Sequence, residues 1–271
     1  MATGNVTLTE GMRANLFSLQ NTSKLMELTQ KRLATGKRVN TALDDPINFF
    51  AAKNHQQRAD DLTFRKDGMG EAIQTIKAAD NGIDAITSLI ASAKSTAVSA
   101  LSTTDTTERA SLATQFNALM DQVDRLAEDS SYKGVNFLSA DTLTVTFDAG
   151  GSSTLAIAGF EGNAGSLGMV DATNSWAEPA NINAAVTNLD AATDTLRTNS
   201  KNLSNSLSTI TARQDFTEKM INTLEGGVAN LTNADLNEEG ANMLMLQTQQ
   251  ALGTTALSLA SQAAQGVLRL F

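Results

Sequence analysis

The side chains that could perform acid–base or metal chemistry are few in this sequence. His55 is the only histidine and no cysteine is present, so no cluster of imidazoles or thiolates can bind a metal. Asp44 and Asp45 are adjacent carboxylates, the kind of pair that general acid–base catalysis uses. They directly precede Pro46, however, and an aspartate followed by a proline is the expected start of a helix. We therefore interpret the two acids as helix caps and His55 as a surface helix residue.

Three further patterns resemble ligand-binding motifs but fail on their spacing. Lys37 and Arg38 follow Gly36, but Lys31 stands where a phosphate-binding loop needs its first glycine. Residues 233–239 carry Asp, Glu and Asn without the spacing of a calcium loop. Glycines also recur at every third residue, as in turns rather than in a dinucleotide motif, at Gly159, Gly162, Gly165 and Gly168. The sequence therefore predicts no catalytic, cofactor-binding or metal site, and no enzyme.

Charge and apolar content exclude other classes of protein. The formal net charge is −9 and the pI about 4.6, whereas a nucleic-acid-binding protein needs a basic face. No apolar run approaches the roughly 20 residues of a membrane span, and the first residues lack the hydrophobic region of a cleaved signal. We expect neither nucleic-acid binding nor membrane insertion, and any export must use another route. Aromatic residues are only 4%, so the core must consist of aliphatic side chains, which suit seams between helices.

Apolar residues at spacings of three and four predict the helices that must position all of these groups. One such stripe runs through residues 8–33, and others cover residues 69–101 and 112–126. Residues 102–108 interrupt the pattern with Ser, Thr and Asp, which can cap the next helix. The first half of the chain therefore reads as helices joined by short breaks.

The second half returns to the same pattern after a different middle. Leu143, Val145 and Phe147 alternate with threonines, and a Gly-Gly pair at 150–151 precedes a second apolar stretch at 155–157, which indicates a β-hairpin. From residue 182 to 231 the helical stripe hardly breaks, as is typical of a coiled-coil seam. Residues 233–240 interrupt it before a final stripe from 243 to 271.

The predicted fold class is mainly α: an elongated antiparallel helical hairpin or coiled-coil rod with a small β-hairpin and loop at its distal end. Both terminal helices are amphipathic, and together they bury little area. Their apolar stripes are better explained if they also pack against other copies of the chain.

Two stretches resemble a known family. Residues 28–58, LTQKRLATGKRVNTALDDPINFFAAKNHQQR, are similar to the N-terminal signature of bacterial flagellins, and residues 230–271 are similar to their C-terminal signature. The segment SSYKGVNFL (130–138) resembles the family's stretch where helix gives way to β structure. Only the middle lacks a match, and its small size resembles the short flagellins of alphaproteobacteria.

The resemblance implies a subunit that self-assembles into the extracellular flagellar filament. It implies export in the unfolded state through the flagellar type III apparatus, an inner tube of terminal helices (1–40 with 233–271), and an outer tube (41–232) that contains the hairpin and surface loop (133–180). Self-assembly would bury these residues on neighbouring copies: Leu8, Met12, Leu16, Leu19, Met26, Leu33, Met243, Leu246, Leu257, Val267, Leu268 and Phe271.

The loop at residues 36–46 would then be one strand of a joint between the two tubes. Gly36 permits the turn, and Asp44 or Asp45 with Pro46 starts the outer helix. Lys37 and Arg38 are available to pair with acids of the second strand, within the subunit or between copies, at Asp235, Glu238 or Glu239.

The implied partners are further copies of the chain, sister flagellins, the hook-associated junction and cap proteins, and an export chaperone. In flagellins that the vertebrate innate receptor recognises, two arginines stand where this chain has Ser92 and Lys94, so we predict weak or no activation. The alternatives are the hook–filament junction protein, an intracellular coiled-coil scaffold, and an enzyme built on the middle segment.

Overall fold

A computed structural model describes residues 10–268, with side chains at all of these positions except Ala264, Val267 and Leu268. The chain divides into two compact units. The terminal unit combines the residues up to Gln57 with those from Thr223 onward, and the central unit holds Arg58–Asn222. Within the described residues the fold is mainly α-helical with one small antiparallel sheet, which confirms the fold class at that level.

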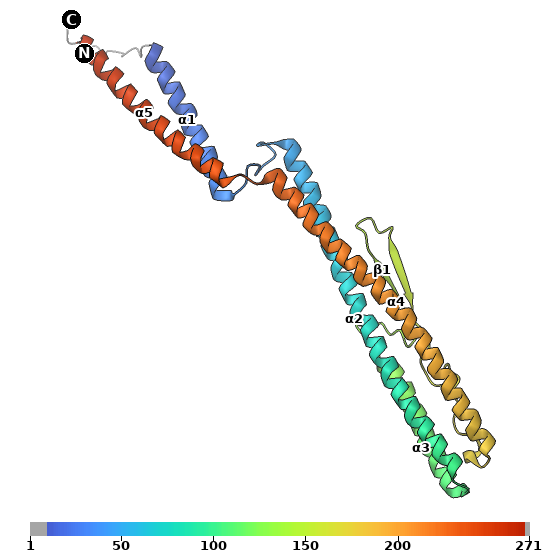
Figure 1. Ribbon diagram of the computed structural model, residues 1–271. Helices are drawn as coiled ribbons and strands as arrows, with labels where there is room; N and C mark the ends of the chain where they lie inside the picture. The colour runs from blue at the N-terminus through green and yellow to red at the C-terminus, as the bar shows by residue number, and fades with distance from the viewer. Residues whose placement is uncertain (1–9, 269–271) are drawn as a thin grey trace, which may run out of the picture. The chain divides into compact units, whose positions relative to one another are not determined.

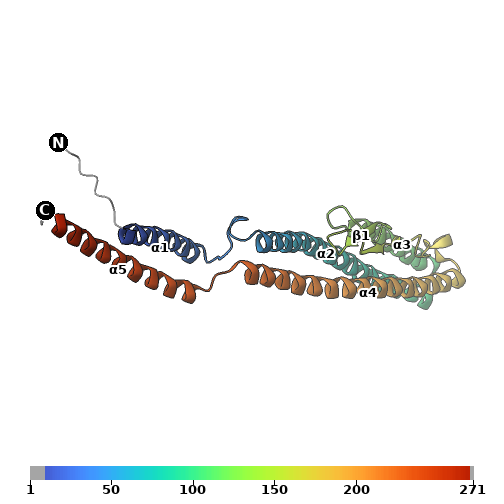
Figure 2. The same cartoon turned by 90° about the horizontal axis from the view of Figure 1, so that it is seen from above.

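Two antiparallel helices make up most of the terminal unit. Helix α1 (Glu10–Thr35) lies beside α5 (Leu236–Leu268), as both views show (Figure 1, Figure 2). The same unit contains the first turns of α2 (Pro46–Ser102) and the last turns of α4 (Pro179–Thr232). The predicted unbroken helix after residue 180 is confirmed as α4.

The break between α4 and α5 is shorter than predicted. We expected residues 233–240 to interrupt the helix, but α5 already begins at Leu236. The reason is Asp235, whose Oδ1 accepts a hydrogen bond from the backbone N–H of Asn237 at 2.9 Å. The acids of this stretch thus start a helix by capping it rather than extending the loop.

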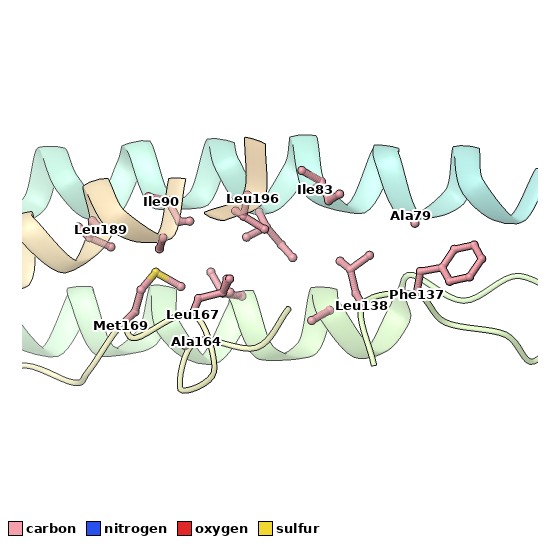
Figure 3. Close-up of a cluster of buried hydrophobic side chains, with 14 of the residues drawn as sticks. Ala79, Ile83, Ile90, Phe137, Leu138, Ala164, Leu167, Met169, Leu189 and Leu196 are labelled. Carbon is pink, nitrogen blue, oxygen red and sulfur yellow. The ribbon is translucent and has the colours of Figure 1, made fainter. Parts of the chain in front are cut away.

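The core of the central unit lies where α2 and α4 meet α3 (Thr106–Asp129) and the chain that follows α3. Apolar side chains from α2, α4 and residues 137–169, Phe137 among them, point into the space between these elements (Figure 3). Asp105 caps α3 by accepting from the Thr107 N–H at 2.8 Å, as the composition of residues 102–108 predicts. The core is aliphatic apart from a few aromatic rings, in line with the composition.

The predicted hairpin is confirmed. Strands β1 (Thr142–Thr146) and β2 (Thr154–Ala158) pair antiparallel, with Leu143 opposite Ile157 and Val145 opposite Leu155. Val145 and Ile157 are buried against the helices, whereas Thr144 on β1 and Ala156 on β2 are exposed. The period-two pattern therefore places one face of the sheet on the core.

The segment SSYKGVNFL folds around Asn136. Its side-chain amide donates to the carbonyls of Ala127 and Glu128, at 2.7 and 3.0 Å, and so satisfies the C-terminal end of α3. Its Oδ1 accepts from the Leu138 N–H at 2.9 Å. One buried asparagine thus ends a helix and starts the turn that leads into the hairpin.

A short 3-10 helix, η1 (Thr173–Trp176), closes the central unit. The Trp176 ring is fully buried, with its centroid 4.8 Å from that of Phe116 on α3. Asn174, Ser175 and Trp176 all have positive φ, between 47° and 54°. This left-handed turn is unfavourable for side chains with a Cβ, and the burial of the indole ring offsets its cost.

Candidate functional site

The seam between α1 and α5 contains part of the set of residues that we expected to carry self-assembly. Met12 and Leu246 are buried in it, at 8% and 4% exposure. Other members of the set are half-buried: Leu19, Met26, Leu33, Met243 and Leu257. Leu16 is 40% exposed. The structure therefore places most of the described members wholly or partly against the chain's own helices.

Four members of that set lie beyond what the structure describes. Leu8 and Phe271 are outside the described residues, and Val267 and Leu268 lack described side chains. The assignment of the whole set to contacts between copies stays a prediction.

The two helices approach closely at Gly253. A Cβ at this position would lie 2.6 Å from Cδ2 of Leu19, so glycine leaves room for the leucine. The carbonyl of Gly253 also accepts a hydrogen bond from the side-chain amide of Asn15 at 3.3 Å. A stripe with a glycine and small polar residues thus still packs tightly, because the backbone itself forms part of the interface.

A second apolar row on α5 was missed by the sequence reasoning. Met245, Leu252 and Leu259 are 51%, 65% and 62% exposed and recur at intervals of seven residues. Leu244 on α5, and Phe17 and Leu25 on α1, are also more than half exposed. The seven-residue interval was the signal that could have revealed the row, since it is typical of coiled-coil seams.

No charged residue occurs from Gly240 to Leu268. A helix that faces water on one side normally carries charge there. By contrast, α1 carries Glu10, Arg13, Lys24, Glu27, Lys31 and Arg32. Helix α5 therefore has the surface chemistry of a helix that is covered on more than one side.

Backbone hydrogen bonds link the two connections of the terminal unit, which are the loop between α1 and α2 and the break between α4 and α5. The N–H groups of Arg38 and Val39 donate to the Thr232 carbonyl at 2.7 and 3.2 Å, and the Ala234 N–H donates to the Gly36 carbonyl at 3.0 Å. Gly36 has φ of +68°, a left-handed conformation that glycine adopts at little cost. The loop after α1 and the break before α5 are thus one connected feature.

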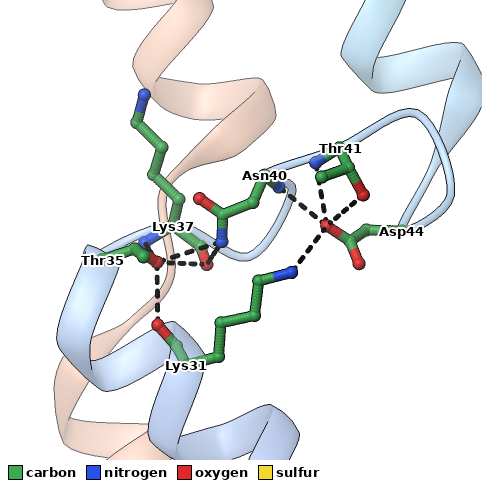
Figure 4. A network of polar contacts seen from close by, with 6 residues as sticks. All are labelled: Lys31, Thr35, Lys37, Asn40, Thr41 and Asp44. Carbon is green, nitrogen blue, oxygen red and sulfur yellow. Dashed lines mark hydrogen bonds and ion pairs between the residues drawn. The ribbon is translucent and has the colours of Figure 1, made fainter.

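The two adjacent aspartates have different tasks. Asp44 Oδ2 accepts from the backbone N–H groups of Thr41 and Asn40 at 2.9 and 3.0 Å, and Lys31 Nζ lies 3.9 Å away (Figure 4). These hydrogen bonds lower the pKa of Asp44, and the bond from the Thr41 N–H has the largest effect. Asp45 caps α2 instead, since its Oδ1 accepts from the Asn48 N–H at 3.1 Å and Pro46 occupies the first helical position.

Ion pairing at the connection differs from the pairing that we considered for Lys37 and Arg38. Glu239 pairs with Arg32, whose Nη1 lies 2.8 Å from its Oε1. In the described part of the chain, no ion pair involves Lys37 or Arg38, and both side chains are exposed. Asp235 and Glu238 are also exposed.

The described residues contain few of the features that catalysis requires. Among residues 10–268, no group of three or more His, Cys, Asp or Glu side chains is arranged to hold a metal ion. His55 is half-buried on α2. A groove of about 440 Å³ lies between α2, residues 132–135 and β1 in the central unit.

Two titratable groups that line this groove are paired with each other. Lys133 Nζ lies 2.7 Å from Glu71 Oε2, and this hydrogen bond lowers the pKa of Glu71 and raises that of Lys133. Both groups thus remain charged near neutral pH, which does not favour a proton-transfer role. No helix within residues 10–268 combines the length and apolar character that a membrane crossing requires.

Comparison with known proteins matches both halves of the chain. The bacterial flagellin N-terminal helical region matches residues 9–142, and the bacterial flagellin C-terminal helical region matches residues 180–271. Flagellin FljM of Caulobacter vibrioides is 30% identical over 100% of both chains, and the flagellin FljK of the same bacterium is 29% identical over the same shares.

More distant matches have similar names. The flagellin of Brucella melitensis is 25% identical and covers 94% of this chain and 95% of its own. The crystal structure of Bacillus cereus flagellin matches 55% of this chain and 88% of its own, with a TM-score of 0.49 and 19% identity.

Flagellins are structural proteins that are exported through the flagellar type III apparatus and self-assemble outside the cell. The two family regions, together with relatives matched over their full length, show that this chain belongs to the bacterial flagellin family, of the alphaproteobacterial type, and is a structural subunit of the extracellular flagellar filament.

Proposed function

We propose that the α1–α5 pair is the element through which copies of this flagellin polymerise, and that residues 1–40 with 233–271 form the inner tube of the filament. The observation that carries this proposal is that α5 has two apolar faces, of which α1 covers one. Leu246 lies on the covered face, whereas Leu252 lies on the open face.

The open face has the spacing of a helix seam. Met245, Leu252 and Leu259 recur every seven residues, so a partner helix can follow them over several turns. A leucine or methionine that passes from full exposure to full burial contributes about 1.5–3 kcal/mol, and these partly covered side chains contribute a part of that. Three such side chains per subunit, repeated along a polymer, supply a substantial driving force without a single charged contact.

The covered face then has a different part in assembly. Met12 and Leu246 hold the two helices of one subunit together, and the pair presents the open face to the next copy. Removing residues 240–271 would delete both faces at once. We expect such a truncation to remain a soluble, mostly helical monomer, and filaments from it would count against the proposal.

A sharper experiment compares two single substitutions on α5. Leu252→Gln changes an exposed side chain, so the fold of the monomer should persist while polymerisation is lost or needs a much higher concentration. Gln247→Ala is the matched control, since helical geometry places it on a different side of α5 from Leu252. Sedimentation and electron microscopy report filaments, and circular dichroism reports the fold. Normal filaments from Leu252→Gln at the wild-type concentration would refute this role of α5.

The joint and the outer part complete the proposal. Residues 41–232 form the outer tube, and the hairpin and loop at 133–180 face outward. Lys37 and Arg38 pair with Asp235 or Glu238 of a neighbouring copy, because within one subunit Glu239 is already paired with Arg32. Charge reversal at 37–38 should weaken filaments, and reversal at 235 and 238 should restore them. Failure of that rescue would leave these charges without a role in assembly.

The remaining partners follow from the same role. As a filament subunit, the chain meets sister flagellins, the hook-associated junction and cap proteins, and an export chaperone, and it catalyses no reaction. The junction protein is the alternative function, and the flagellin matches do not favour it. A deletion strain distinguishes the two, since loss of a junction protein leaves hooks without filaments whereas loss of one of several flagellins shortens or weakens them.

Weak or absent activation of the vertebrate innate receptor is supported by the contacts of two residues. Lys94 Nζ lies 2.5 Å from Oδ1 of Asp190 on α4, so this cation already has an acidic partner within the chain. The Ser92 hydroxyl donates to the Ser88 carbonyl of its own helix. A receptor reporter assay should show a response well below that of an activating flagellin, and equal potency would contradict this prediction.

A further inference from the structure

Three large apolar side chains at the start of α2 face solvent. Leu43, Ile47 and Phe50 are 96%, 81% and 54% exposed, and Leu43 is the most exposed large apolar side chain in the described residues. Ile47 and Phe50 are one turn apart on α2, and Leu43 lies in the turn that leads into it. We call these three residues the connection patch. The sequence reasoning assigned no role to any of them.

The backbone that carries the connection patch is held in one conformation. Asp44 stabilises the turn by accepting hydrogen bonds from the N–H groups of Asn40 and Thr41, and Asp45 caps α2 by accepting from the Asn48 N–H. The Phe50 ring packs edge-on against Phe49, with centroids 5.5 Å apart. The backbone of the patch is therefore preorganised, so burying it costs little ordering of the loop.

The two neighbouring acids do not place free charge beside the patch. Asp44 is directed into the turn and toward Lys31, and Asp45 is directed at the first turn of α2. The part of a partner that covers these three side chains should thus be apolar, because burial of an unpaired charge is costly. Leu244 of α5 is 67% exposed, is not in the row of Met245, Leu252 and Leu259, and lies in the longest uncharged stretch of the described chain, 240–268, so a second copy offers a surface of the required kind apart from that row.

We propose that a second copy of this chain buries the connection patch on assembly. The proposal rests on the proposed function, in which α5 carries a separate contact. The connection patch and the open face of α5 are different surfaces. A contact in which the patch of one copy meets a different surface of the next copy is heterologous. Heterologous contacts propagate from copy to copy, and they build open helical polymers where the rotation between copies does not close into a ring.

Cysteine accessibility tests the burial directly, because the chain contains no cysteine. Leu43→Cys should react rapidly with a maleimide in the monomer and at least about tenfold more slowly in filaments. Ala149→Cys, at the exposed turn of the hairpin, is the matched control for access of the reagent and should react at similar rates in both states. Equal reactivity of the cysteine at position 43 in monomer and filament would overturn the proposal.

A triple substitution, Leu43→Ser with Ile47→Ser and Phe50→Ser, tests the energetic role. The side chains are exposed, so the circular dichroism of the monomer should be unchanged, while the critical concentration for polymerisation should rise by about tenfold or more. An unchanged critical concentration would contradict a contribution of the patch to assembly.

The outcomes separate this inference from the proposed function. If Leu252→Gln blocks polymerisation but position 43 stays reactive in wild-type-like filaments, the α5 contact stands and the connection patch is refuted. If position 43 becomes protected while Leu252→Gln polymerises normally, the patch stands and the role of the open face of α5 is refuted.

Discussion

Arg32 on α1 and Glu239 on α5 form an ion pair that links the two terminal helices, with Nη1 and Oε1 2.8 Å apart. The side chain of Glu239 is only 9% exposed and that of Arg32 28%. Arg32 Nε and Glu239 Oε2 are buried and have no hydrogen-bond partner among the described residues. Each charge thus depends on the other, since little else in the terminal unit solvates it.

Breaking that pair should loosen the end of the α1–α5 seam. Glu239→Gln leaves the arginine charge partly buried without a counter-charge, and we expect a loss of about 1–3 kcal/mol in the free energy of unfolding. Chemical denaturation and hydrogen exchange of α1 and α5 measure the effect. The control is Asp194→Asn, which breaks the exposed Asp194–Arg197 pair and should change stability by less than about 0.5 kcal/mol. Equal effects of the two substitutions would contradict a special role for the buried pair.

Gly159 is predicted to be intolerant of any side chain. A Cβ there would collide with the backbone carbonyl oxygens of Phe137 and Asp141, which cannot move aside as a side chain can. Gly159→Ala should therefore destabilise the central unit by about 1–3 kcal/mol, as overpacking does. Gly165→Ala serves as the control, because the nearest atom to its Cβ would be Asn163 Oδ1 at 3.7 Å. Denaturant titration of both variants measures the free energy of unfolding. An unchanged value for Gly159→Ala would contradict the prediction, because it would show that the backbone can move aside.

The turn at Asp44 should depend on pH. The N–H groups of Thr41 and Asn40 lower the pKa of this carboxyl below its ordinary value of about 3.9. A lowered folded-state pKa means that the stabilisation is complete above the ordinary value and is lost as the pH falls through the folded pKa. The stability difference between wild type and Asp44→Asn should thus be constant near neutral pH and shrink below about pH 4. A stability difference that stayed constant down to pH 2 would show that the ionised Asp44 carboxylate is not its cause.

The single tryptophan should be essential to the central unit. Trp176 is fully buried against Phe116, and its removal leaves a large cavity. Trp176→Ala should cost about 3–5 kcal/mol, measured by thermal unfolding followed by circular dichroism. Phe64→Ala, at a ring that is 70% exposed, should cost far less. In the wild type, the tryptophan fluorescence should report unfolding of the central unit; a transition that left it unchanged would contradict the burial.

The helices and the hairpin could be predicted from the sequence because local patterns determine them. Leu143 and Val145 alternate with threonines, and the helical stripe after residue 182 continues without a proline. The predicted break before α5 is too long because it treats all of residues 233–240 as an interruption, although Asp235 carries the same capping signal as Asp105.

Which residues contact each other in the folded chain was harder to predict than where the helices and strands lie in the sequence. The periodicity around Leu246 identifies a buried face but does not say whether the chain's own α1 or another copy covers it. In the same way, the sequence offered Lys37 as a partner for the acids of the joint, but within one subunit the residue that pairs with Glu239 is Arg32 of α1.

Buried polar groups escaped the sequence reasoning altogether. Arg109 is only 7% exposed, and its guanidinium donates to the carbonyls of Ala100, Thr103 and Ala177. It thereby satisfies the C-terminal end of α2 with a side chain from α3. No local pattern marks such a residue, because its partners come together only in the folded chain.

The backbone bonds between the two connections bear on how this region can evolve. The donors are the N–H groups of Arg38, Val39 and Ala234, and the acceptors are the carbonyls of Thr232 and Gly36. Such bonds do not depend on which side chains are present, so mutations at the exposed Arg38 and the half-buried Ala234 can change charge or shape on the surface and still leave the connection closed, whereas the Val39 side chain is buried. Proline is the exception, since it removes the N–H. Related chains can therefore diverge here in the surface that they offer to their neighbours while they keep the same joint.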